Sequence, residues 1–171
     1  MRQPLTLAVA QPRCVPYDAV VNVVTHAATV RAAGTRVVVA AEDARLAPII
    51  EACSETGSVA LVGAPVQGEA GRSHIAMVAV DGSGAADTAA LGIDVYVASV
   101  LESVEEAARQ DERARRIATD HRVWVAVASF AGSTGGGYAQ AAGRSAIWGP
   151  GGVLVAQAGI EAGAIARARL L

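Results

Sequence analysis

The sequence contains no lysine, and all 14 of its basic side chains are arginine. This absence excludes any chemistry that needs a side-chain amine, such as Schiff-base formation. Charged residues make up only 18% of the 171 residues, and 14 arginines against 16 acidic residues leave a formal net charge of -2. Because nucleic-acid binding depends on clustered positive charge, this balance argues against a nucleic-acid partner.

Cysteine and histidine are also scarce. Cys14 and Cys53 are too few for a disulfide framework, so we expect a reducing, cytoplasmic location. His26, His74 and His121 are far apart and lack the spacing of zinc ligands. We therefore expect no metal and no cofactor.

Long membrane-spanning runs are missing as well. The longest stretch without a charge, Val123 to Gly143, has Gly132-Ser-Thr-Gly-Gly-Gly137 at its centre, which makes a poor membrane helix. The N-terminal Met-Arg-Gln-Pro leads into only a short apolar segment with no cleavage-like site, so we expect no signal peptide and no membrane association.

Alanine and valine are abundant instead. Hydrophobic residues make up 53% of the chain although aromatic residues contribute only 4%. The length fits a single domain over residues 1–171, and one of this size can bury a sizeable core. Since few charges are available to cover the surface, we expect a homodimer or a higher homo-oligomer.

Apolar runs and helical patterns alternate along the first half of the chain, which indicates the α/β class with parallel strands. Asp18 is placed to cap a helix over Ala19 to Ala33, and Gly34 to end it. In the last third, short spacings between strands predict antiparallel hairpins. The expected strands are 5–10, 36–41, 58–63, 74–80, 95–99, 123–128, 145–148, 153–157 and 164–168, and the other expected helices are 46–56 and 101–121.

Specific residues at these junctions resemble the nitrilase superfamily of carbon–nitrogen hydrolases. The opening Leu-Ala-Val-Ala-Gln at 7–11 and the later Arg113-Ala-Arg are similar to family motifs. The most specific match is Gly143-Arg-Ser-Ala-Ile-Trp-Gly-Pro-Gly-Gly152. The resemblance implies an α-β-β-α sandwich. It also implies that the helix over 101–121 contributes to a subunit interface, with Ala108 and Ile117 as pairing candidates.

Members of the family use a glutamate, a lysine and a cysteine. Glu42 stands where the resemblance places the glutamate, at the end of the second strand. The lysine and the cysteine would lie between the Asp81-Gly82 turn and the strand at 95–99, but only residues 83–92 occupy that interval. The sequence therefore predicts a sandwich truncated in the middle, with an apparent deletion near 83–92.

Two candidate catalytic residues remain. Glu42 could be vestigial, capping the helix that begins near Leu46 or pairing with Arg45, or it could act as a general base. Cys14 follows the first strand in a loop and is a candidate nucleophile if it lies near Glu42; otherwise it is a small loop thiol. Cys53 is expected to be a packed thiol within a helix.

These observations favour a catalytically inactive homologue that acts as a binding or structural subunit. An alternative is a divergent amidase-like hydrolase that uses Glu42 with Cys14 or with an activated water, and whose ligand would be a small amide or nitrile. In a third possibility, a longer nitrilase-like partner supplies the missing strands and catalytic groups.

Overall fold

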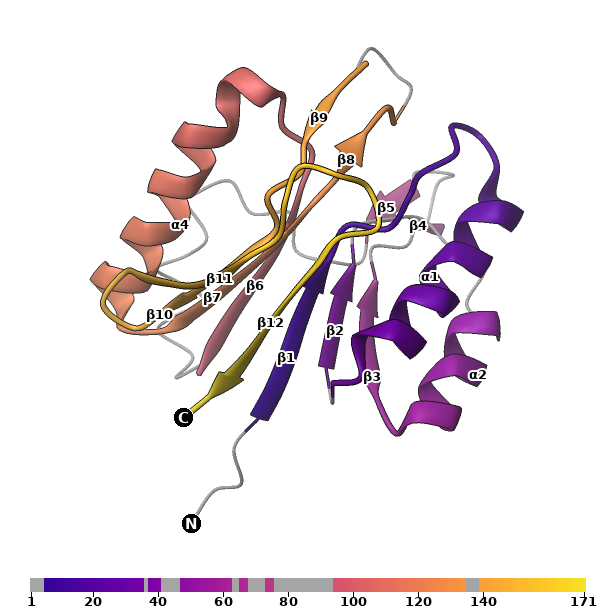
Figure 1. The fold of residues 1–171 in the computed structure, drawn as a ribbon, viewed down its shortest axis with the longest axis horizontal. Helices are drawn as coiled ribbons and strands as arrows, with labels where there is room; N and C mark the ends of the chain where they lie inside the picture. Colours follow the sequence, from indigo (N-terminus) through magenta and orange to yellow (C-terminus); the bar gives the residue numbers. More distant parts are fainter. Residues whose placement is uncertain are drawn as a thin grey trace.

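Two β-sheets of four strands each face one another, with helices on both outer sides (Figure 1). The computed structural model describes residues 5–35, 37–40, 47–62, 65–67, 73–75, 94–134 and 139–171. Helices α1 (Ala19–Ala33) and α2 (Ala47–Thr56) cover one sheet, and α4 (Ala107–His121) covers the other. The predicted α-β-β-α sandwich is therefore confirmed. No helix in these ranges is long and apolar enough to cross a membrane.

The first sheet has the strand order β12-β1-β2-β3. Its strands are β1 (Leu5–Ala10), β2 (Val37–Ala40), β3 (Val59–Val62) and β12 (Ile165–Leu170). β1, β2 and β3 run parallel, joined through α1 and α2, while β12 is antiparallel to β1. Because Ala10 pairs with Ala40, β1 and β2 end at the same edge of the sheet.

The second sheet has the strand order β11-β10-β7-β6. Its strands are β6 (Val95–Val100), β7 (Trp124–Ser129), β10 (Ala146–Gly149) and β11 (Val153–Gln157). β6 and β7 are parallel and are connected through α4, and the other pairs are antiparallel. Two small antiparallel pairs complete the described strands: β4 (Pro65–Gln67) with β5 (Ser73–Ile75), and β8 (Ala131–Gly132) with β9 (Ala141–Ala142).

Local signals at both ends of α1 act as predicted. The Asp18 carboxylate accepts a hydrogen bond from the Val21 amide at 3.0 Å, which satisfies one of the unpaired donors of the first turn. Gly34 ends the helix in the left-handed conformation, with φ of 58°, which glycine adopts at no steric cost.

Helix α4 begins later than the pattern predicts. The expected start at Leu101 is wrong, because Ser103 is extended and the chain first forms the 3-10 turn η2 (Val104–Glu106). The Ser103 amide donates to the Glu106 carboxylate at 3.0 Å, half of a capping box that fixes the start of this turn.

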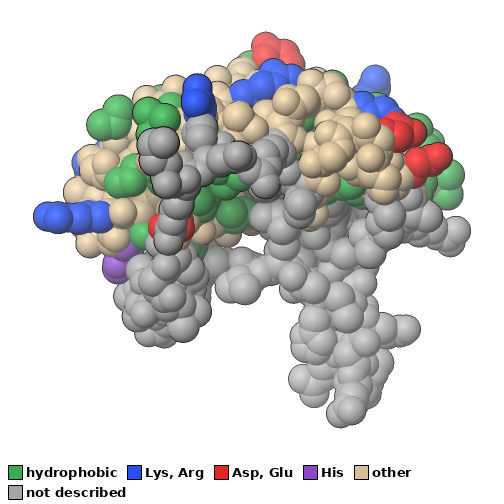
Figure 2. Space-filling view, turned by 90° about the horizontal axis from the view of Figure 1, so that it is seen from below, with side chains coloured by type: hydrophobic (Ala, Val, Ile, Leu, Met, Phe, Trp, Pro, Cys, Tyr) green, Lys and Arg blue, Asp and Glu red, His purple; other side chains and the backbone are tan. Residues whose placement is uncertain are grey.

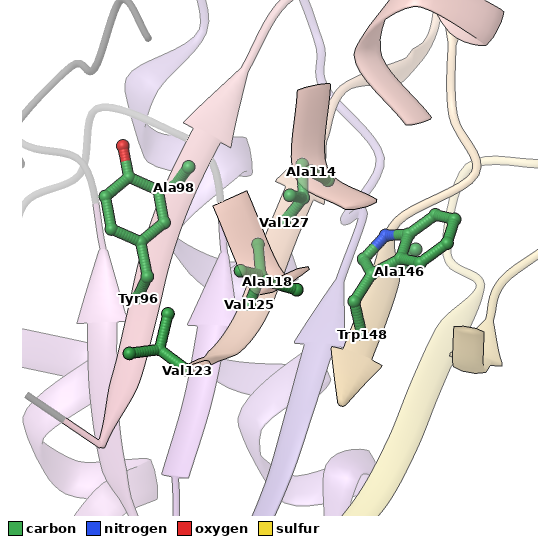
Figure 3. Close-up of a cluster of buried hydrophobic side chains, with 9 residues drawn as sticks. All are labelled: Tyr96, Ala98, Ala114, Ala118, Val123, Val125, Val127, Ala146 and Trp148. Carbon is green, nitrogen blue, oxygen red and sulfur yellow. The ribbon is translucent and has the colours of Figure 1, made fainter. Parts of the chain in front are cut away.

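Three apolar layers hold the sandwich together, and alanine and valine fill most of their positions. The layer between α4 and the second sheet consists of Tyr96, Ala98, Ala114, Ala118, Val123, Val125, Val127, Ala146 and Trp148 (Figure 3). The layer between the sheets consists of Leu7, Val9, Ala126, Ala128, Ile147, Ala158, Ala166 and Leu170. The layer under α1 and α2 consists of Ala8, Ala10, Val23, Ala27, Val30, Ala33, Val38, Ile49 and Ala52.

The hairpin prediction for the last third is correct for β10 and β11 but wrong for β12. After β11 the chain crosses to the first sheet, where β12 pairs with β1 from Leu5↔Leu170 to Ala10↔Ile165. The short segment between β11 and β12, whose length suggested a hairpin, instead links the two sheets. The buried Gln11 side chain holds this segment through hydrogen bonds to the Gly159 and Glu161 carbonyls.

Charged side chains are sparse among the described residues on one face of the molecule. On the face seen from below, arginine and acidic side chains are scattered among apolar and neutral ones (Figure 2). This view agrees with the low charge content of the sequence. The interval 83–92, where the deletion is predicted, lies outside the described residues.

Candidate functional site

The two predicted catalytic residues follow β1 and β2 in the sequence. Cys14 lies four residues beyond Ala10, the last residue of β1, and Glu42 lies two residues beyond Ala40, the last residue of β2. Since these two strands are adjacent and parallel, both segments leave the same edge of the sheet. Such edges are where α/β proteins place functional groups. Glu42 lies outside the described residues, and so does Arg45, its predicted partner.

Cys14 is buried, with 9% of its surface exposed. The loop that carries it is held by Asn22 of α1, whose amide oxygen accepts from the Val15 amide at 2.8 Å and whose amide nitrogen donates to the Val15 carbonyl at 3.1 Å. The same nitrogen lies 4.0 Å from the Cys14 sulfur. Reactive thiols usually lie beside a cation and are partly exposed. The Cys14 residue is buried, and one of its neighbours is the neutral Asn22 amide.

His26 lies one helical turn beyond Asn22 and is 1% exposed. Its Nδ1 is 2.8 Å from the Asn22 backbone carbonyl. A carbonyl can only accept, so Nδ1 carries a hydrogen and donates it. Within the described ranges Nε2 has no hydrogen-bond partner.

The three histidines belong to three separate elements, α1, β5 and the end of α4. In the part of the chain that the structure describes, no group of three or more His, Cys, Asp or Glu residues is placed to hold a metal ion. Cys53 lies on α2, is half-buried and packs against the apolar layer beneath the helix, as predicted for a structural thiol.

Gln11 connects this edge to the far end of the chain. Its side chain is completely buried. Its amide nitrogen donates to the carbonyls of Gly159 and Glu161 at 2.9 and 2.7 Å, and its amide oxygen accepts from the Ser145 backbone amide at 3.0 Å. The Ser145 hydroxyl in turn accepts from the Ser129 amide at 3.0 Å. These bonds join β1 to the segments around β10, β11 and β12.

A small pocket lies between α4 and the second sheet, and its cavity volume of about 20 Å³ is enough for one water molecule. It is lined by Glu102, Ala107, Gln110, Asp111, Ala114, Val127, Ser129, Ala142, Gly143, Arg144, Ala146 and Trp148. The buried indole nitrogen of Trp148 has no hydrogen-bond partner among the residues described. The Ser129 hydroxyl donates to the Phe130 carbonyl at 3.1 Å.

Both carboxylates of the pocket face arginines. Asp111 pairs with Arg144 at 2.7 Å, and Glu102 lies 3.5 Å from Arg113. Burial, together with the neighbouring Glu106, raises the pKa of Glu102 above its ordinary value, and Arg113 offsets only part of this. The lining offers charge pairs but no thiol or amine, so the pocket has room for a water molecule and supplies no strong nucleophile.

Comparison with solved structures identifies the architecture. Saccharomyces cerevisiae Nit3, a member of branch 10 of the nitrilase superfamily, matches with a TM-score of 0.78 at 15% identity, over 98% of this chain and 90% of that one. A mutant of the Nesterenkonia AN1 amidase, from the same superfamily, matches with a TM-score of 0.79 at 13% identity, over 97% of this chain and 90% of that one. The chain has the nitrilase-superfamily fold.

The Caenorhabditis elegans NitFhit protein shares this nitrilase-like fold with a TM-score of 0.67 at 11% identity, over 98% of this chain and 60% of the longer one. The sequence itself matches no family model and no curated protein.

Two residues of this site, Gln11 and Glu102, are not among the predicted site residues. Gln11 directly follows a fully apolar strand, and a polar residue in that place is a signal of buried hydrogen bonding. For Glu102 the signal is the Ser103-x-x-Glu106 capping pattern, which starts a helical turn directly after it.

Proposed function

We propose that the chain is a catalytically inactive nitrilase-like protein that acts as a binding or structural subunit. The observation that carries this proposal is the complete absence of lysine, because no residue can fill the lysine role that the resemblance implies. The burial of Cys14 supports it, since reactive thiols are usually partly exposed. The scaffold that would present a binding surface is kept, with both sheets and both outer helix layers in place.

Ammonia release tests this proposal. The purified chain is incubated with simple amides, N-carbamoyl amines and nitriles beside a Glu42→Gln variant, with the Nesterenkonia AN1 amidase as a positive control. We expect the parent and the variant to release the same background of ammonia. Turnover that disappears in Glu42→Gln would overturn the proposal.

The alternative function is a divergent amidase-like hydrolase that uses Glu42 as a base with Cys14 or an activated water. The observation in its favour is the parallel pairing of β1 with β2, which sends the segments carrying Cys14 and Glu42 from the same sheet edge. If Cys14 is the nucleophile, Cys14→Ala abolishes turnover while Cys53→Ala, the matched control, retains it. Equal turnover in the two variants would exclude the thiol version.

Covalent labelling gives a second readout for the thiol. In a mutant of the Nesterenkonia AN1 amidase, the acetamide moiety of fluoroacetamide adds covalently at the active-site cysteine. An inactive subunit predicts that mass spectrometry finds no faster labelling of Cys14 than of Cys53, whereas an active thiol predicts selective labelling of Cys14.

A longer nitrilase-like partner remains a further proposal for the subunit role. In the described part of the second sheet, β6 pairs with β7 alone, so its other edge is a position at which a strand from such a partner could add. Co-purification of a longer homologue from the native source would support this arrangement, and recovery of the chain only with itself would count against it.

A further inference from the structure

The indole of Trp148 places a hydrogen-bond donor inside the protein. Trp148 lies on β10, and only 8% of its surface is exposed. Its ring packs into the apolar layer between α4 and the second sheet, but its Nε1 has no hydrogen-bond partner among the described residues. Buried N–H groups are costly to leave unpaired, and in folded proteins most of them bond to protein atoms or to ordered water. We therefore expect an acceptor beside this nitrogen.

The small pocket beneath α4 is where this acceptor can lie. Trp148 is one of the residues that line it. In Figure 3 the indole nitrogen is on the edge of the ring turned toward Ala114 of α4, which lines the same pocket. Ala114, Val127 and Ala146 form the wall of the pocket near the indole and carry no polar side-chain atom. The N–H group thus faces the pocket from its apolar side.

The size of the pocket limits what it can hold. Its cavity volume is about 20 Å³. A volume of about 10–15 Å³ measured in this way is sufficient for one water molecule. The occupant therefore has the size of one water molecule.

The charges of the lining select a neutral occupant. Glu102 and Asp111 would repel an anion. A cation is excluded on different grounds, because it cannot accept a hydrogen bond from the indole. Arg144, the arginine of the lining, is already paired with Asp111 at 2.7 Å. A neutral molecule that both accepts and donates hydrogen bonds fits this lining, and water does both.

Glu102 is the side chain best placed to accept from such a water. Its Oε1 lies 3.5 Å from Arg113, farther than the usual distance of about 2.7–2.9 Å for a charge-assisted hydrogen bond. Asp111, by contrast, is bound closely by Arg144. An ionised carboxylate offers about four acceptor positions, so Glu102 has capacity for a water molecule. The Glu102 carbonyl accepts from the amide of Ala142, another lining residue, at 2.9 Å, which holds Glu102 at the pocket.

We propose that this pocket is a hydration site, in which one water molecule accepts a hydrogen bond from the Trp148 indole and donates one to the Glu102 carboxylate. The water connects β10 of the second sheet to the segment between β6 and η2, which leads into α4. It also supplies the acceptor that the indole lacks. The site goes beyond the function proposed above, since it is the same in an inactive subunit and in a hydrolase.

Nuclear magnetic resonance of the full ¹⁵N-labelled chain detects the water. The chain has two tryptophans, and Trp148→Phe assigns their indole signals. We expect the Trp148 indole N–H of wild type to show a cross-peak to water with opposite signs in NOESY and ROESY spectra, which distinguishes a bound water from hydrogen exchange. A Trp148 indole without this cross-peak would overturn the proposal.

Filling the pocket tests where the water lies. Ala114→Val adds two methyl groups at the pocket, and Ala118→Val is the matched control. Both alanines are buried on α4 and belong to the same apolar layer, but only Ala114 lines the pocket. We expect Ala114→Val to abolish the cross-peak and Ala118→Val to retain it, and the amide spectrum of each variant shows whether it is folded. A cross-peak that survives in folded Ala114→Val would overturn the proposal.

A second pair of variants tests the acceptor and does not depend on repacking the layer. Glu102→Leu keeps a side chain of similar size but removes the carboxylate, so we expect the cross-peak to weaken at least twofold. Glu105→Leu is the control, because Glu105 is exposed and does not line the pocket, and its cross-peak should match that of wild type. A cross-peak of full strength in Glu102→Leu, or an equal loss in Glu105→Leu, would overturn the assignment of Glu102.

Discussion

Replacing Gln11 with alanine should destabilise the whole sandwich, although the residue lies in no helix and beyond the end of β1. The change removes three hydrogen bonds at a completely buried position. The Gly159 and Glu161 carbonyls each keep a second donor, the amides of Arg144 and Ala164. The buried Ser145 amide loses the side chain that accepts its hydrogen bond.

The magnitude follows from these losses. An orphaned buried amide costs about 1–3 kcal/mol, and each of the other two bonds contributes about 0.5–1.5 kcal/mol. Because both carbonyls retain a partner, we expect a total near 3 kcal/mol. With a typical urea dependence of about 2 kcal/mol per molar, the unfolding midpoint should fall by about 1.5 M.

Urea unfolding followed by far-ultraviolet circular dichroism and by tryptophan fluorescence measures this effect. The control is Gln140→Ala, since Gln140 is exposed and, among the described residues, its side chain makes one weak bond of 3.4 Å, to the Ala141 carbonyl. Gln11→Glu adds a sign test: its buried carboxylate would face two carbonyls, so the loss should shrink as the pH falls and the group becomes a protonated donor. A midpoint within about 0.3 M of wild type for Gln11→Ala, or an equal loss in Gln140→Ala, would refute the reasoning.

Two further substitutions test other contacts. Arg167 of β12 donates through Nε and Nη2 to the Ala33 and Ala32 carbonyls, both at 2.7 Å. Arg167→Lys should lose one of these bonds, so we expect the free energy of unfolding measured in urea to fall by about 1 kcal/mol. The same change at the exposed Arg169 is the control and should have little effect. Burial raises the pKa of Glu102, so its carboxylate form disfavours folding and wild type loses stability as the pH rises through the folded pKa. Glu102→Gln avoids this loss, and its stability relative to wild type should increase from about pH 4 to pH 7 in thermal melts; a constant or falling difference would contradict the assignment.

Local signals made much of the fold predictable. Leu5 to Ala10 is a continuous apolar run and forms β1 with the predicted bounds, and α1 starts after Asp18 and stops before Gly34 as expected. In each case the residues that decide the outcome are neighbours in sequence, so propensity and capping chemistry are sufficient. The predicted start of α4 at Leu101 is wrong because Ser103, two residues further on, caps the 3-10 turn η2, and this turn precedes the helix.

Long-range contacts were not predictable in the same way. The crossing of β12 to the first sheet depends on Gln11 reaching carbonyls that lie 148 and 150 residues away. No local pattern encodes such a partner, and the short spacing before β12 favoured a hairpin. At the candidate site, the position of Cys14 beside the end of β1 followed from the strand prediction, but the Asn22 side chain that holds its loop did not.

The pairing of β1 with β12 has a consequence for how the chain is made. β1 and β12 pair along their full length, from Leu5↔Leu170 to Ala10↔Ile165, although residues 11–164 separate them in the chain. During synthesis one edge of β1 therefore stays open until β12 has been made, and open strand edges are where nascent chains associate wrongly. Pairing between segments so far apart in sequence is slow, so we expect the closure of the first sheet to be a late step of folding.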